Sequence, residues 1–259
     1  MFFQLGSGCC RITDLKILSC DFTMIFNYIK NPSTLIKEES NGNSFWKNFP
    51  LLFFKLLAVI FVSGVVYSLI SFILDPSSGF SFPDNYANNL KEYVNKMPLA
   101  YLWIILIGPA YEEITFRMGL DFERNSFVFS LFMVLFLVTG GTIFPAKFDS
   151  QYIVNLIFRV VPLMILYFTV GRKITQKHVS FLKERYYNQI VYLVAIVFSV
   201  LHLPNYFPFH LSQLSFYILI MSVFFYISMT LSYIRIKHGL AHAIVFHTSW
   251  NLFQMLISR

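Results

Sequence analysis

Residues 98–120 have the sequence "PLAYLWIILIGPAYEEITFRMGL", a long apolar segment that carries two adjacent glutamates and an arginine. The segment is about as long as the ~20 residues that a helix needs to cross a bilayer. A charged side chain inside the bilayer costs about 3 kcal/mol or more, so such residues are retained when they are paired or functional. We therefore expect a transmembrane helix whose charged side chains face the interior of a helical bundle.

The composition of the whole chain is typical of a multi-span membrane protein. Hydrophobic residues make up 56% of the 259 residues, only 13% are charged, and the mean hydropathy is +0.61. A soluble domain could not keep so much apolar surface away from water. We predict an all-α fold, a polytopic transmembrane helical bundle with an intramembrane polar cavity. About seven spans are expected, near residues 49–74, 98–120, 126–143, 153–170, 189–203, 211–235 and 239–257.

The formal net charge is +7, and most lysines and arginines lie between the apolar segments. The positive-inside rule then predicts a cytoplasmic N-terminus, and the basic residues favour membrane lipid as a partner. Nucleic acid is not expected as a partner, because no helix face combines basic and aromatic residues as such binding requires. The basic segment "GRKITQKHVSFLKER" at 171–185 fits either an amphipathic surface helix or a solvated loop.

Composition divides the chain into three parts. Residues 1–48 are mixed and polar, which predicts a cytoplasmic or interfacial lead-in. Within it, residues 1–23 hold all three cysteines, and Met24 offers a second plausible start, so we expect the natural protein to begin there. Three cysteines in this segment indicate neither a disulfide framework nor a cysteine metal site. Residues 49–97 are expected to hold the first span and an external loop, and 98–257 the part that carries chemistry.

The charged residues of the opening segment differ in their expected partners. Glu113 and Arg117 are four residues apart with the acid first, the favoured arrangement for an ion pair on one helix face. Glu112 lies about 100° around the helix from Glu113, so we expect it to point into a cavity of the bundle. The alternative is a buried ion-pair network that only holds helices together.

A second polar position occurs in "FSVLHLPNY" at 198–206. Phe198 and His202 stand four residues apart, and Pro204 ends the apolar segment. Taken alone, a histidine at the end of an apolar helix is more often an interfacial hydrogen-bonding residue than a catalyst.

A third polar stretch, "HGLAHAIVFHTSWN" at 238–251, lies in the last predicted span. His247 and Asn251 share one helix face and could hold a water or a carbonyl oxygen, although a purely structural polar patch fits equally well. His242 is about 140° round from His247, which favours a structural role. His238 is expected to be solvated at the cytoplasmic edge.

The expected depths of these residues do not all agree. At ~1.5 Å per residue, Glu112 and His247 each lie ~12 Å inside the cytoplasmic end of their spans, so they can meet. His202 lies ~20 Å from the expected start of its span by the same rise. It reaches the other two only if its helix begins later, tilts or protrudes from the membrane.

The three motifs together resemble a known signature. Glu-Glu-x-x-x-Arg at 112–117, Phe-x-x-x-His at 198–202 and His-x-x-x-Asn at 247–251 are similar to the motifs of the CAAX-protease and bacteriocin-processing family, also called CPBP or Abi. All three are intact and in order. The resemblance implies that residues 98–257 form an intramembrane protease core, whose polar cavity cleaves peptide bonds near the cytoplasmic membrane face.

The resemblance also implies a role for each residue. Glu112 would be the general base that activates water, His202 and His247 would order that water or a metal, and Asn251 would stabilise the oxyanion. Because the family has been described both as metalloproteases and as glutamate-dependent enzymes, zinc at Glu112, His202 and His247 is one alternative. We favour the metal-free glutamic mechanism. The resemblance implies supporting roles for Glu113, Arg117 and Phe198.

The implied function is that of an intramembrane endopeptidase acting on a peptide or membrane-protein substrate. The phenylalanine-rich chain with short loops favours an integral protein of a bacterial plasma membrane, and hence peptide maturation or bacteriocin self-immunity over CAAX-type processing. One alternative is a non-catalytic membrane adaptor of the same fold that regulates a partner enzyme. Another is an ion-coupled transporter, which the absence of internal repeats disfavours.

Overall fold

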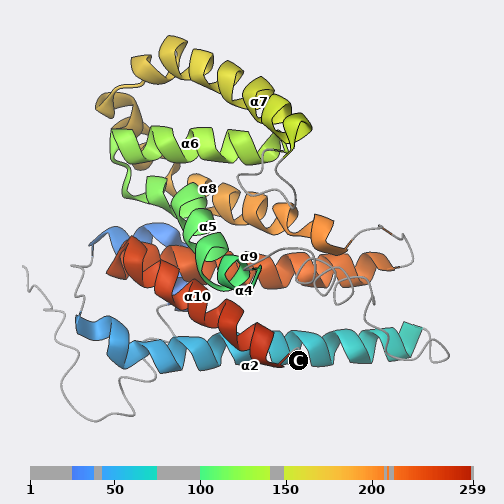
Figure 1. Ribbon diagram of the computed structural model, residues 1–259. Coiled ribbons are helices and arrows are strands. Elements are labelled where there is room, and N and C mark those ends of the chain that lie inside the picture. The colour runs from blue at the N-terminus through green and yellow to red at the C-terminus, as the bar shows by residue number, and fades with distance from the viewer. Residues whose placement is uncertain are drawn as a thin grey trace, which may run out of the picture.

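The computed structural model in Figure 1 describes residues 25–37, 43–74, 100–140, 149–206, 209 and 213–257. These residues form helices and turns without any strand, which confirms the all-α prediction. The possible second start at Met24 and the external loop after residue 74 lie outside the described residues. The described elements are η1 (Pro32–Lys37), α2 (Asn43–Leu74), α4 (Ala100–Leu102), η2 (Trp103–Ile107), α5 (Gly108–Arg117), η3 (Met118–Asp121), α6 (Arg124–Val138), α7 (Ser150–Thr169), η4 (Gly171–Lys173), α8 (Gln176–Leu201), η5 (Leu203–Tyr206), α9 (Leu214–His238) and α10 (Leu240–Ile257).

The chain is a polytopic helical membrane protein. Helical segments occupy every predicted span position, and four of them are long and apolar enough to cross a membrane: Phe45–Leu69, Ser150–Lys173, Gln176–Tyr206 and Leu214–His238. The helix α6 is apolar but shorter. The count of seven crossings therefore stays a prediction.

The centre of the bundle is α9, which packs between α8, α10 and α2 (Figure 1). Every residue from Ile227 to Ile234 on this helix is buried. A helix that is covered on all sides needs apolar or small residues all round, and its hydroxyl side chains must find partners within the protein. The central helix therefore offers Ser228 as a polar contact for its neighbours.

At the opposite extreme, α7 has no buried residue and lies at the edge of the bundle beside α6 (Figure 1). Its large apolar side chains are exposed, with Phe158 at 74%. A 20-residue helix with this surface would not be stable in water, so hydrocarbon must cover it.

The helix α8 begins earlier than the sequence predicts. It starts at Gln176 rather than near residue 189, and it is kinked at Tyr186, where φ is −130° and ψ is 18°. The basic segment is therefore helical from Gln176 onward, with Val179 buried and Phe181 exposed. His202 follows the last turn of α8, and α5 crosses α8 obliquely in Figure 1. This crossing brings His202 to Glu112 despite the unequal depths expected from the sequence.

The end of α5 is fixed by an arginine from α9. Arg235 donates from Nε to the carbonyl oxygen of Arg117 at 3.1 Å, and its Nη2 lies 2.9 Å from Asp121 Oδ2. The last carbonyls of a helix have no partner within the helix, so a cation there supplies hydrogen bonds and favourable charge. Arg235 thereby holds the C-terminal end of α5 against the central helix.

Two histidines, His238 at the end of α9 and His242 in α10, make structural contacts. His238 was expected to be solvated, but only 8% of it is exposed, because the Phe45 ring lies 5.4 Å from its ring. His242 donates from Nδ1 to the carbonyl oxygen of His238 at 2.6 Å and packs its ring 4.5 Å from that of Phe45. His238 therefore packs the end of α9 against α2, contrary to the expectation that it is solvated, and His242 packs α10 against α2.

Candidate functional site

The predicted site residues meet where α5, the end of α8 and α10 come together. Glu112, Glu113 and Arg117 lie on α5, and His247 lies on α10. His202 caps the C-terminal end of α8. Three segments that are distant in the sequence therefore contribute to one cluster.

Glu113 and Arg117 form the predicted ion pair. Arg117 donates from Nη1 to Glu113 Oε1 at 2.8 Å, and both side chains are 0% exposed. The other guanidinium nitrogen, Nη2, donates to Ser228 Oγ at 2.7 Å. The Phe198 ring covers the guanidinium, with its centroid 4.2 Å from Cζ. Hydrogen bonds and a cation–π contact thus replace part of the hydration of this charged pair, while Glu113 Oε2 and Arg117 Nε are buried without a hydrogen-bond partner.

Glu113 also orients His247. The Nδ1 atom of His247 lies 2.9 Å from Glu113 Oε1, the same oxygen that accepts from Arg117. A carboxylate paired with arginine accepts hydrogen bonds, so Nδ1 of His247 carries the proton. In its neutral form this imidazole carries its lone pair on Nε2, which lies 3.8 Å from Glu112 Oε2.

His202 is held in the same tautomer by a different partner. Its Nδ1 lies 2.7 Å from the carbonyl oxygen of Phe198, which can only accept a hydrogen bond. Its ring packs against those of Phe198 and Phe224, with both centroids 4.3 Å away. The Nε2 lone pair of His202 is thus directed to Glu112 Oε2 at 3.7 Å.

When both imidazoles are neutral, their Nε2 atoms and Glu112 Oε2 are three hydrogen-bond acceptors that face one another. Glu112 Oε2 is buried without a hydrogen-bond partner, and the distances of 3.7 and 3.8 Å to the two imidazoles are too long for direct hydrogen bonds. The side chain of Glu112 is nevertheless 30% exposed, so the cluster can be reached from outside. Lone pairs that face one another require a proton donor or another electron-pair acceptor between them.

The donor set suits zinc in kind but not in spacing. Zinc is bound by imidazole nitrogen and carboxylate oxygen, and its histidine ligands commonly donate their other N–H to a carboxylate or a carbonyl. Tetrahedral ligands at ~2.1 Å from zinc stand ~3.4 Å from one another, closer than the 3.7 and 3.8 Å separations of this cluster. In the described part of the chain, no group of three or more histidine, cysteine, aspartate or glutamate side chains is arranged to hold a metal ion.

The amide of Asn251 has a partner that the sequence did not predict. Its Nδ2 donates to the carbonyl oxygen of Ile104 at 2.9 Å. Ile104 lies in η2, a short π-helix just before α5. One of the two amide hydrogens of Asn251 is therefore used within the protein, and the predicted oxyanion role, which stays a prediction, would fall to the other.

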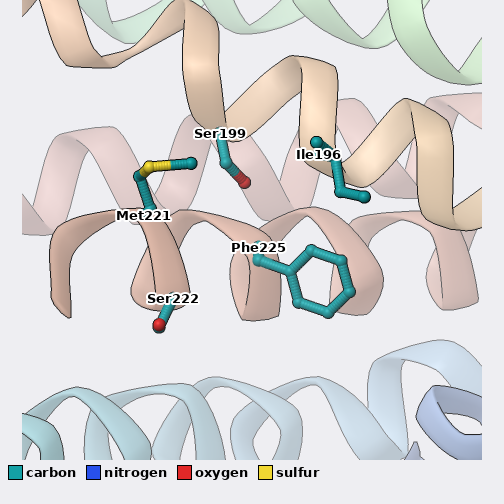
Figure 2. A pocket seen from close by; sticks show the side chains of 5 residues that line it. All are labelled: Ile196, Ser199, Met221, Ser222 and Phe225. Carbon is teal, nitrogen blue, oxygen red and sulfur yellow. The ribbon is translucent and has the colours of Figure 1, made fainter. Parts of the chain in front are cut away.

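A separate pocket of about 250 Å³ lies between α8 and α9. Figure 2 shows Ile196 and Ser199 of α8 on one side and Met221 and Phe225 of α9 on the other. Ser222 completes the lining, which contains none of the predicted site residues. We therefore assign this pocket no part in the chemistry of the Glu112 cluster.

Sequence reasoning missed Ser228 and Phe224, the two contributions of α9 to the site. Ser228 lies in "YISMTLSY" at 226–233, where hydroxyl residues alternate with apolar ones in the middle of a span. Hydroxyl groups at that depth mark helix–helix contacts, so this alternation was a usable signal. Phe224 had no such signal, because it is one of 31 phenylalanines in the chain.

Comparisons of the chain with protein-family models, with curated proteins and with solved structures find no match. The resemblance to the CPBP family therefore rests on the three motifs.

Proposed function

We propose that this chain is an intramembrane endopeptidase that hydrolyses peptide bonds near the cytoplasmic membrane face with a water activated by Glu112. One observation carries the proposal: Glu112 Oε2 and the Nε2 atoms of His202 and His247 converge, and each Nδ1 is held by an acceptor, so each Nε2 of a neutral imidazole is free to accept. A scaffold has no use for a buried Glu112 Oε2 that lacks a donor, because such a group destabilises the fold.

A water molecule supplies what this arrangement lacks. Its two hydrogens can be donated to Glu112 Oε2 and to one imidazole Nε2, which leaves an oxygen lone pair for attack on a peptide carbonyl carbon. As the oxygen bonds to that carbon, Glu112 takes one proton from the water. The same proton is then transferred to the amine nitrogen when the carbon–nitrogen bond breaks. Glu112 thus acts first as a general base and then as a general acid.

The negative charge that develops on the carbonyl oxygen requires a donor. Asn251 stands one helical turn after His247 and has one amide hydrogen beyond the one that binds Ile104. That hydrogen is our candidate oxyanion donor, an interaction that contributes about 3 kcal/mol in a dry site. Arg117 lies behind Glu113 and is fully buried, so it serves the cluster by holding it together.

Zinc is the alternative occupant of the cluster. Glu112, His202 and His247 would hold the ion only if their separations shortened from 3.7 and 3.8 Å, and the ion would then supply Lewis acidity and lower the pKa of a bound water. Exhaustive chelation followed by elemental analysis separates the two mechanisms. Stoichiometric zinc whose removal abolishes cleavage would replace the metal-free mechanism with the zinc one.

The substrate class we propose is a peptide or a membrane-protein segment, in peptide maturation, bacteriocin self-immunity or CAAX-type processing. The apolar helices around the cluster support a substrate that reaches it from the membrane or its surface. Among these roles we favour peptide maturation and self-immunity, because the composition of the chain is typical of bacterial membrane proteins.

Cleavage of a membrane-peptide library in liposomes tests the proposal. Wild type is compared with Glu112→Gln and with Glu123→Gln, a matched change of an exposed glutamate before α6. We expect cleavage by wild type and by Glu123→Gln, and a loss of at least about 100-fold in Glu112→Gln, since general-base catalysis typically contributes that much. Equal cleavage by all three proteins would refute the role of Glu112. No cleavage by wild type of any library peptide would favour the non-catalytic adaptor, and proton uptake by the same liposomes would favour the transporter.

A further inference from the structure

The helix that carries Glu112 changes its hydrogen-bond register one turn before it. Residues Trp103–Ile107 form the π-helix η2, and the N–H of Gly108 donates to the carbonyl oxygen of Trp103, five residues back. Short π-segments inside α-helices are uncommon and are frequent at functional sites. The next residue, Pro109, is buried in the first turn of α5.

The π-segment followed by Pro109 leaves the carbonyl oxygen of Ile104 without a backbone donor. In the π-register, the carbonyl oxygen of Ile104 would accept from the N–H of residue 109, and proline has no N–H. In the α-register it would accept from Gly108, whose N–H is directed to Trp103 instead. Within a membrane span no water replaces the missing donor, so the partner must come from a neighbouring helix.

Asn251 is that partner. Its Nδ2 reaches the Ile104 carbonyl oxygen at 2.9 Å from α10. One turn earlier on the same helix, His247 binds Glu113. The helix α10 is therefore fastened to the helical segment of Ile104 and Glu113 at two points, one on each side of the turn that bears Glu112.

We propose that Asn251 is a positioning residue that replaces the N–H missing at Pro109, and that this hydrogen bond fixes the placement of His247 relative to Glu112. With Asn251 removed, the His247–Glu113 hydrogen bond remains to tie α10 to this segment, and the tie at Ile104 is lost. The Nε2 atom of His247 can then move relative to Glu112 Oε2. The role in catalysis rests on the proposed function, whereas the replacement of the Pro109 donor does not.

A double-mutant cycle tests the replacement directly. Pro109→Ala returns an N–H to residue 109, so the Ile104 carbonyl regains a backbone donor in either register. Asn251→Ala should therefore be harmful when residue 109 is proline and nearly neutral when it is alanine. Gln254→Ala, an exposed change on the same helix, is the control for the loss of an amide side chain from α10.

The first readout does not depend on enzymatic activity. In purified full-length protein, Asn251→Ala should lower Tm by roughly 3–10 °C and speed amide hydrogen exchange in residues 103–113 about tenfold. Both effects should shrink to less than half in the Pro109→Ala background, and Gln254→Ala should show neither. Equal effects of Asn251→Ala in the two backgrounds would overturn the proposal.

The second readout is cleavage, which separates a positioning role from direct contact with substrate. If Asn251 acts through placement alone, instead of as the oxyanion donor proposed above, the Pro109→Ala/Asn251→Ala protein should recover cleavage to within about threefold of Pro109→Ala, because the cluster is again held in place. Cleavage that stays lost while Tm and exchange recover would overturn the positioning role and leave Asn251 as the oxyanion donor. Absence of cleavage in wild type would count against the proposed function alone, because the exchange measurements decide the replacement independently.

Discussion

Glu112 and Glu113 are adjacent in the chain, yet the regions around them have opposite properties. The Glu113 region is closed: one of its oxygens accepts from Arg117 and His247, and its side chain is fully buried. The Glu112 region is open: its side chain is partly exposed, and its buried oxygen faces two imidazole lone pairs without a donor. A rotation of about 100° between consecutive helical residues thus separates a group that holds the site from a group that is free to react.

The largest effect on stability is expected when the closed region around Glu113 loses its cation, Arg117. Arg117→Ala leaves the buried Glu113 carboxylate without its ion-pair partner, which costs about 3–5 kcal/mol. We expect Tm at a fixed heating rate to fall by roughly 8–15 °C, together with lower yield in the membrane. Arg185→Ala, which removes an exposed arginine from α8, should leave Tm nearly unchanged. A similar Tm for the two variants would mean that the closed region does not hold the bundle together.

A smaller loss of stability is expected when Ser228, the uncharged partner of Arg117, is replaced. Ser228→Ala removes the hydroxyl that accepts from Arg117 Nη2 and leaves that N–H buried, at a cost of about 1–3 kcal/mol. Thermal unfolding should show a Tm lower by roughly 3–8 °C. Ser222→Ala removes a hydroxyl from the exposed side of the same helix and is the control. Ser228→Ala as stable as Ser222→Ala would exclude this hydrogen bond from the closed region.

The open region should respond in the opposite sense. Glu112→Gln replaces an acceptor by a group that can donate to His202 or His247, so it relieves the facing lone pairs. We expect Tm to be unchanged or higher by about 1–3 °C, while cleavage is lost. This combination distinguishes a reactive group from a structural one, because replacing a structural group would lower both Tm and cleavage. A Tm as low as that of Arg117→Ala would erase the difference between the two glutamates.

The smallest effect is expected far from both regions. Phe158→Leu on α7 keeps an apolar side chain facing lipid, so Tm and cleavage should match wild type within error. A clear loss of cleavage in this variant would show that the site depends on more than the residues that surround Glu112.

The sequence predicted those features of the site that lie within one helix. The Glu113–Arg117 pair follows from a four-residue spacing, and the direction of Glu112 follows from the helical rotation. The contact of Glu113 with His247 joins residues 134 apart, and that of Arg117 with Ser228 joins residues 111 apart. No periodicity within a segment specifies which helices become neighbours, so these contacts required the three-dimensional structure.

Helix boundaries were predicted less well than helix positions, and α8 shows why. Hydropathy identifies the part of a helix that lies in hydrocarbon, whereas the polar residues from Gln176 to Tyr186 continue the same helix beyond it. The π-segment Trp103–Ile107 was not predicted either. Its local sequence differs from an ordinary apolar helix only by the Gly108–Pro109 pair that follows it.

The exposed surface of α7 has a consequence for handling the protein. Because this helix buries no residue within the chain, the acyl chains around it act as its solvent and as most of its packing partners. Detergents that form thin or mobile micelles would weaken the attachment of α7 before they disturb α9, which is enclosed from Ile227 to Ile234. The choice of detergent therefore determines how much of the fold is present when the Glu112 cluster is assayed.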